Sequence, residues 1–118
     1  MSHTYRELIV WQKAMALVRD IYLQTRKFPK EELYGLAAQM RRSAVSVPSN
    51  IAEGQGRLSK GEFRQFLGMA RGSLLELETQ ILITAELHYV DGKSSERLVS
   101  QTQEVLLMIN GLIDSLPR

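Results

Sequence analysis

The sequence contains no cysteine and only two histidines among its 118 residues. The lack of cysteine excludes disulfides, Cys-ligated zinc, iron–sulfur clusters and cysteine nucleophiles, and it is most natural in a reducing cytosol. His3 and His88 lie too far apart in the sequence to predict a metal site, and neither stands at the Glu-x-x-His spacing of di-iron bundles. We therefore expect no metal, no other cofactor and no enzymatic activity.

Long apolar runs are also missing. Charged residues interrupt every apolar segment, whereas a membrane-spanning helix needs about 20 consecutive apolar positions. Residues 1–6 lack the basic start and the apolar run of a signal peptide. We therefore expect a cytoplasmic protein that does not cross a membrane. A length of 118 residues suits one domain, so residues 1–118 are expected to share a single core.

Four segments have the three- and four-residue apolar spacing that is typical of amphipathic helices. They cover residues 7–27, about 30–54, 59–89 and 94–117, with Ser59 as the cap of the third helix and Ser94 or Ser95 as the cap of the fourth. The expected inward residues, in chain order, are Trp11, Ala14, Val18, Ile21, Leu33, Leu36, Met40, Ala44, Val47, Ile51, Phe63, Leu67, Ala70, Leu74, Leu77, Ile81, Leu98, Thr102, Val105, Ile109 and Leu112, with Leu8, Met15 and Tyr22 widening the first stripe.

Short connections between these helices favour antiparallel neighbours, so the predicted fold is an all-α, up-down-up-down four-helix bundle. Pro48 stands inside the second helix, where it removes a backbone hydrogen bond, and we expect a kink or a short break there. Asn50 and Glu53 follow within about a turn. They are expected to be buried and hydrogen-bonded, and to fix the kink.

A second apolar surface is predicted outside the core stripes. The side of the third helix opposite its core stripe carries glycines and leucines, although each interior glycine costs about 1 kcal/mol of helix propensity. On the first helix, three apolar residues recur seven apart off the main face. One interpretation of both features is that the apolar residues are ordinary exposed residues and that the glycines allow tight packing within one bundle. We favour an interface between identical copies, formed by Ile9, Ala16, Leu23, Gly68, Gly72, Leu75 and Leu82.

The middle of the chain is basic. From Arg41 to Arg71, six basic residues stand against two acidic ones, so this part carries +4 whereas the remainder carries −2. One interpretation is a solvated stripe with ion pairs inside the helix. An oligomer would instead repeat the stripe and create a field that holds phosphates. The candidate phosphate contacts are Arg41, Arg42, Arg57, Lys60, Arg64 and Arg71.

Three segments together resemble one known family. They are LIVWQKAMALVRDIY (8–22), FPKEELYGLAAQMRRSAVSVPSNIAEGQGR (28–57) and FRQFLGMARGSLLELETQI (63–81), of which RRSAVSVPSNIAEG is the most specific part. In them the chain resembles the four-helix bundle proteins encoded in intervening sequences of bacterial 23S rRNA genes. The resemblance implies a kinked second helix and a barrel-like homopentamer. That family is similar to the accessory variability protein of diversity-generating retroelements, a basic pentamer that binds nucleic acid and a reverse transcriptase.

Two functions from different classes follow. The first is a non-enzymatic, homo-oligomeric accessory protein that binds RNA or DNA through phosphates, with a reverse transcriptase or another protein as a further partner. The second is a protein-binding scaffold that has no role with nucleic acid. Electrostatic binding to nucleic acid would weaken steeply with salt, which distinguishes the two.

Overall fold

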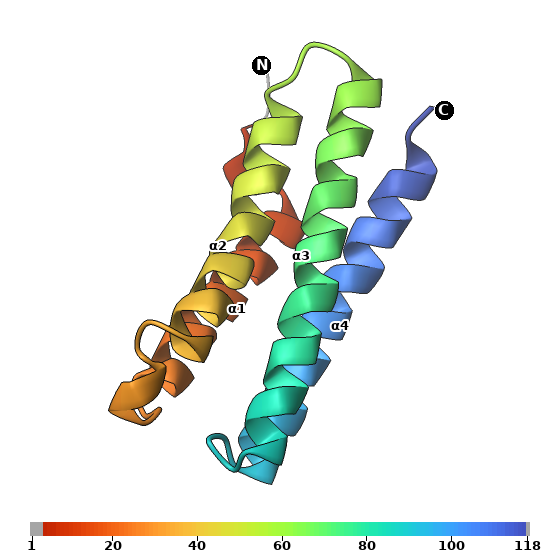
Figure 1. The fold of residues 1–118 in the computed structure, drawn as a ribbon. Helices are drawn as coiled ribbons and strands as arrows, with labels where there is room; N and C mark the ends of the chain where they lie inside the picture. The colour runs from red at the N-terminus through yellow and green to blue at the C-terminus, as the bar shows by residue number, and fades with distance from the viewer. Residues whose placement is uncertain (1–3, 118) are drawn as a thin grey trace.

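The computed structural model describes residues 4–117 and places four long helices side by side (Figure 1). They are α1 (Ile9–Thr25), α2 (Leu36–Gln55), α3 (Lys60–Glu86) and α4 (Gly92–Ser115), and they confirm the predicted all-α bundle. Two single-turn 3-10 helices, η1 (Tyr5–Glu7) and η2 (Lys30–Glu32), precede α1 and α2. The bundle measures 46 × 22 × 22 Å. His3 lies outside the described residues.

The order of the helices puts α1 and α3 on opposite corners. Followed by colour in Figure 1, successive helices run in opposite directions. Between α2 and α3, Ser43 Oγ donates to Glu76 Oε1 over 2.9 Å, and Ser46 Oγ donates to Ser73 Oγ. The residue number on α3 thus falls as the residue number on α2 rises, as it does between helices that run in opposite directions. Each helix packs closely against two others, and within the described chain no Cα atoms of α1 and α3, or of α2 and α4, lie within 8 Å of each other.

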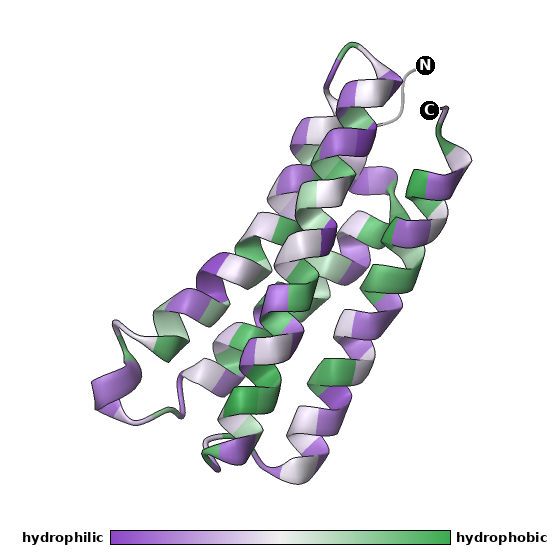
Figure 2. Ribbon diagram, turned by 45° about the vertical axis from the view of Figure 1, so that its right-hand side comes forward, coloured by the Kyte–Doolittle hydropathy of each residue, from purple (hydrophilic) through white to green (hydrophobic). Residues whose placement is uncertain are grey.

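The core follows the predicted stripes closely on α2, α3 and α4, where apolar residues alternate with polar ones along each helix (Figure 2). On α1 the prediction was half right, since Ala14 and Ile21 are fully buried as expected. Val10 and Leu17 are buried there, whereas Trp11 and Val18 are only partly buried and Met15 is exposed. Apolar residues surround this helix on several sides, so their spacing does not decide which side faces inward.

The start of the second helix was predicted wrongly. Lys30–Glu32 is a 3-10 turn, and α2 begins only at Leu36. Glu32 explains the delay, because its Oε1 accepts the backbone N–H of Leu36 over 3.2 Å and satisfies one of the free N–H groups at the start of α2. Leu33 therefore lies in the connection and is exposed, not in the core as expected.

Pro48 is buried inside α2, and the helix continues across it without a break. Asn50 Nδ2 donates to the carbonyl oxygen of Ser46 over 2.8 Å, so this side chain does bond to the backbone near the proline. Glu53 does not join it. Its side chain is exposed and pairs with Arg57 one turn later. A kink at Pro48 stays a prediction.

The ends of α3 and α4 are capped by local hydrogen bonds. Ser59 caps α3 as predicted, since its Oγ accepts the N–H of Glu62 over 3.1 Å. Asp91, not Ser94 or Ser95, caps α4 by accepting the N–H of Ser94 over 2.8 Å. That backbone hydrogen bond is the main reason why the pKa of the Asp91 carboxyl lies below its usual value. His88, two residues after the end of α3, has a φ of 62°, the left-handed conformation in which many helices end.

Gly54 is the glycine that the α2–α3 contact requires. A Cβ there would lie 2.7 Å from Phe66 Cβ and 3.0 Å from Phe63 Cδ1. We expect Gly54→Ala to lower the free energy of unfolding by about 1–3 kcal/mol, because overpacking outweighs the gain in helix propensity. Gly111→Ala on α4, where a Cβ meets nothing within 4 Å, should raise it by about 0.5–1 kcal/mol. Urea unfolding measures both values, and effects of equal sign would contradict this role for Gly54.

Candidate assembly and phosphate-binding surfaces

The residues of the predicted interface lie on two opposite corners of the bundle. On α1, Ile9 and Leu23 are about half exposed. On α3, Leu75 and Leu82 are exposed to a similar degree. Ala16 is partly buried, and Gly68 and Gly72 are exposed. Because α1 and α3 are diagonal helices with no Cα atoms within 8 Å of each other in the described chain, the structure gives one subunit two separate apolar faces instead of one continuous patch.

The outward face of α3 has almost no charge along about five turns. Between residues 65 and 83, the only exposed charged residues are Arg71 and Glu76. Each of them bonds to a neighbouring helix: Arg71 Nε donates to Asn110 Oδ1 over 2.9 Å, and Glu76 accepts from Ser43. The positions between these edges are Gln65, Gly68, Met69, Gly72, Leu75, Thr79, Leu82 and Ile83.

Two glycines on this face do not serve packing inside the subunit. A Cβ added at Gly68 or Gly72 would meet nothing within 4 Å. The interpretation that these glycines allow tight packing within one bundle is therefore wrong. Any group that requires their small size must come from outside the subunit.

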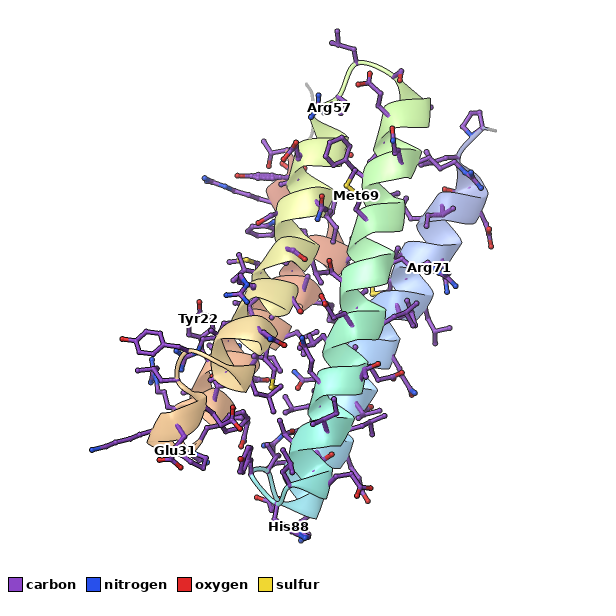
Figure 3. The ribbon with its side chains drawn as sticks, in the orientation of Figure 1. Tyr22, Glu31, Arg57, Met69, Arg71 and His88 are labelled. Carbon is purple, nitrogen blue, oxygen red and sulfur yellow. The ribbon has the colours of Figure 1, made fainter. Side chains whose placement is uncertain are left out.

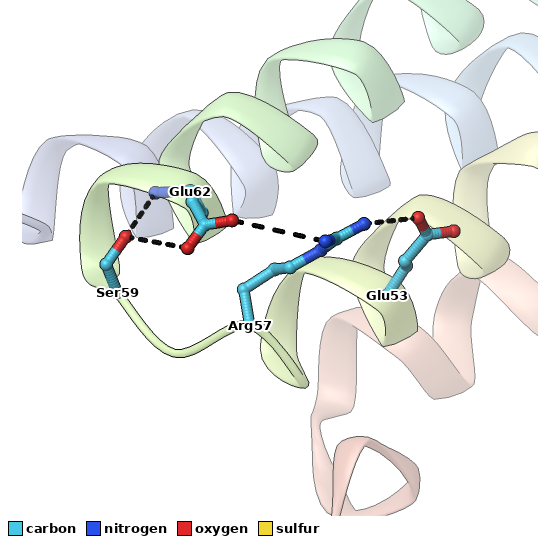
Figure 4. A network of polar contacts seen from close by, with 4 residues as sticks. All are labelled: Glu53, Arg57, Ser59 and Glu62. Carbon is cyan, nitrogen blue, oxygen red and sulfur yellow. Dashed lines mark hydrogen bonds and ion pairs between the residues drawn. The ribbon is translucent and has the colours of Figure 1, made fainter.

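Arg41 and Arg57 are engaged inside the subunit. Arg41 Nε donates to Thr25 Oγ1 over 2.9 Å, and its guanidinium lies over the ring of Tyr22, 4.8 Å from the centroid. Arg57 lies 2.8 Å from a Glu53 carboxylate oxygen and 4.0 Å from one of Glu62 (Figure 4). The charge of Arg57 is thus largely balanced where it stands.

The other four candidate cations, like Arg41, have no carboxylate partner within 4.0 Å in the described part of the chain. Arg64 and Arg71 come together on the side of α3 that faces α4, and Figure 3 shows Arg71 beside α4. Lys60 is the first residue of α3. Arg42 is separate, in a polar groove between α2 and α3 with Gln80. The six predicted residues therefore do not form one patch.

Sequence reasoning missed a groove between α1 and α2. It has a volume of about 840 Å³ and includes Tyr22, Leu33, Tyr34 and Val45. Tyr34 in this groove is 92% exposed. Away from the groove, Leu107 on α4 is a second large apolar residue with high exposure, 72%. The available signal was the position of Val45 and Leu107 off the core stripes of their helices.

Two further features of the described chain are the arrangement of its metal-ligating side chains and the apolar length of its helices. No three His, Asp or Glu side chains of residues 4–117 are placed to hold a metal ion. None of the helices that the structure describes is long and apolar enough to span a bilayer.

Comparison with known proteins finds a similar solved structure and a matching family. A crystal structure of a protein of unknown function from the S23 ribosomal protein family of Bacteroides thetaiotaomicron is similar, with a TM-score of 0.82 over 91% of this chain and 100% of that chain. Their sequences are 20% identical, so this likeness shows the fold alone. No curated protein matches. A family model described as the 23S rRNA-intervening sequence protein matches residues 6–111. The chain therefore belongs to the 23S rRNA-intervening sequence protein family.

Proposed function

We propose that this protein is a non-enzymatic accessory protein that assembles from identical copies, five as the family resemblance implies, and holds a nucleic acid by its phosphates. One observation carries the proposal. The outer side of α3 joins an uncharged, half-apolar face to two arginines, Arg64 and Arg71, that lack a carboxylate partner in the described chain. The first feature favours contact with another copy, and the second favours contact with an anion.

The positions of the apolar faces favour a ring. A two-fold dimer buries the same patch on both subunits, whereas two different patches on opposite sides of a subunit join head to tail. Here the α1 face of one copy covers the α3 face of the next copy. Such contacts close into a cyclic assembly when the rotation between neighbours divides a full turn.

Assembly strengthens the case for nucleic acid. The net charge of one subunit is only +2, which gives a weak field. A ring repeats Lys60, Arg64 and Arg71 at regular intervals, and a phosphate backbone is itself a regular series of charges. Contacts of this kind fix position without reading bases, so we expect little sequence preference.

Removing the three α3 cations tests the proposal. In the variant Lys60→Gln/Arg64→Gln/Arg71→Gln, affinity for single-stranded RNA of mixed sequence should fall at least about 100-fold at low salt. The slope of log K against log salt should decrease by roughly one for each phosphate that the variant no longer neutralises. Filter binding at several salt concentrations measures both quantities.

The matched control removes three cations elsewhere. Arg26, Lys93 and Arg97 are exposed, lie in no ion pair of the described chain, and belong to the other end of the bundle. Their replacement by glutamine should change affinity only a few-fold. Equal losses in the two triple variants would argue against a local site. If the wild type binds no RNA at low salt, the nucleic-acid role is wrong, and the α1–α2 groove with Tyr34 and Val45 then favours the alternative of a protein-binding scaffold.

A further inference from the structure

A pocket lies between α3 and α4 at the level of Arg64 and Arg71. Its volume is about 520 Å³. Three residues of α3 and three of α4 line it: Arg64, Gly68, Arg71, Asn110, Ile113 and Asp114. Gly68 was predicted as an interface residue, and the pocket gives it a different environment from that of Gly72, which does not line it.

Gly68 leaves open the space between the two arginines. Arg64 and Arg71 are seven residues apart, about two turns, so they lie on the same side of α3 with Gly68 between them. Any larger residue would put a side chain there, because nothing else lies within 4 Å of a Cβ at Gly68. Two guanidinium groups beside an open space are suited to a phosphate, which accepts charge-assisted hydrogen bonds from both.

The two guanidinium groups differ in how they are held. Arg71 Nε donates to Asn110 Oδ1, which fixes the plane of its guanidinium against α4 and leaves the terminal nitrogens for a ligand. Arg64 Nε is buried and has no acceptor among the described residues. A buried donor without an acceptor is rare in folded proteins, and this Nε–H of Arg64 is unsatisfied within the described subunit.

Asp114 contributes the one negative charge of the pocket. It is exposed, and no ion pair within 4.0 Å joins it to Arg64 or Arg71. Two guanidinium groups against one carboxylate leave the pocket with a net positive charge. Asp114 should therefore weaken the binding of an anion without preventing it.

We infer that this pocket is a built site for a single phosphate group, with Arg64 and Arg71 as its ligands and Gly68 keeping open the space between them. The inference rests on the proposed function for its source of phosphate, which is a nucleic-acid backbone. It gives Gly68 a role in ligand access, whereas Gly72 keeps the predicted role in contact between copies.

The test places a carboxylate inside the pocket. In Gly68→Glu the new side chain lies four residues after Arg64 and three before Arg71, the spacings at which helix side chains meet, so it competes with phosphate for both arginines. Gly72→Glu is the control, because it adds the same charge to the same helix face next to Arg71 in sequence but not facing either arginine. Both positions have room for a side chain, and circular dichroism checks that both variants fold.

Binding is followed in two ways. Inorganic phosphate is titrated into the full-length protein while NMR records the Nε–H signals of Arg64 and Arg71, a readout that does not require assembly. Phosphate should shift both signals in the wild type and in Gly72→Glu but not in Gly68→Glu. For single-stranded RNA, Gly68→Glu should bind at least about tenfold more weakly than wild type. Asp114→Asn should bind phosphate at least about twofold more tightly, since it removes the opposing charge.

The outcomes separate this inference from the proposed function. If phosphate shifts neither arginine in the wild type, or still shifts both in Gly68→Glu, the pocket is not a phosphate site, even where RNA binding persists. If phosphate binds as expected and the wild type binds no RNA, the pocket stands with free phosphate as its source, and the nucleic-acid role is wrong.

Discussion

Replacing Leu82 with glutamate is expected to separate the assembled copies while leaving helix content almost unchanged. Leu82 is 51% exposed on the uncharged face of α3, so a charge there is harmless to an isolated subunit. In an interface the same carboxylate would be buried without a partner, at a cost of about 3–5 kcal/mol in every contact of the ring. Light scattering should show the molar mass fall from a multiple of 13.4 kDa, about fivefold by the family resemblance, to the mass of one subunit.

A control variant distinguishes an interface from a general effect of surface charge. Leu107 on α4 is more exposed than Leu82 and lies outside the predicted interface. Leu107→Glu should therefore keep the mass of the wild type. An unchanged mass in Leu82→Glu, with circular dichroism confirming the fold, would remove Leu82 from the interface.

The fold could be predicted because helical periodicity records burial directly. Leu67, Leu74 and Ile81 recur at seven-residue steps and are all fully buried. The same reasoning was only half right on α1, where Val10 and Trp11 are adjacent and both apolar, so spacing alone does not orient the helix. Only packing against α2 and α4 decides that Val10 is the more buried of the two.

Helix ends were predicted less well, because several polar residues compete for the same backbone groups. Ser94, Ser95 and Asp91 can each cap α4 by residue type. Asp91 does so because its carboxylate accepts both the N–H and the hydroxyl of Ser94. Glu32 likewise takes the place of a residue-type cap at α2, and its other carboxylate oxygen accepts the hydroxyl of Tyr89, which lies just beyond the end of α3. That contact spans 57 residues and has no sequence signal.

In the candidate site, too, contacts between residues close in sequence could be predicted, whereas contacts between different helices could not. The pairing of Arg57 with Glu53 follows the four-residue spacing and could have been read from the sequence. The contact of Arg71 with Asn110 joins residues 39 apart, and that of Arg41 with Thr25 joins different helices. Sequence located the cations, but only the structure shows which of them have a carboxylate or a hydrogen-bond partner.

The location of the two apolar faces also required the structure. Both stripes could be predicted, but not that α1 and α3 lie on opposite corners of the bundle. Because the two apolar faces lie on opposite corners, we predict a head-to-tail contact in which the α1 face of one copy meets the α3 face of another. The absence of cysteine makes this geometry accessible to clean chemical cross-linking.

Cross-linking Ala16→Cys to Gly72→Cys with a short bismaleimide tests the head-to-tail contact most directly. Both positions lie near the middle of their helices, at opposite corners of a bundle 22 Å across, so the other helices stand between them and oppose a short link within one subunit. At micromolar concentration the double variant should give a ladder of covalent multimers on a denaturing gel, ending at the number of copies in the ring. Each single variant should give no ladder. Only monomers from the double variant, with Ala16→Cys and Gly72→Cys both reacting freely with a monofunctional maleimide, would contradict the account.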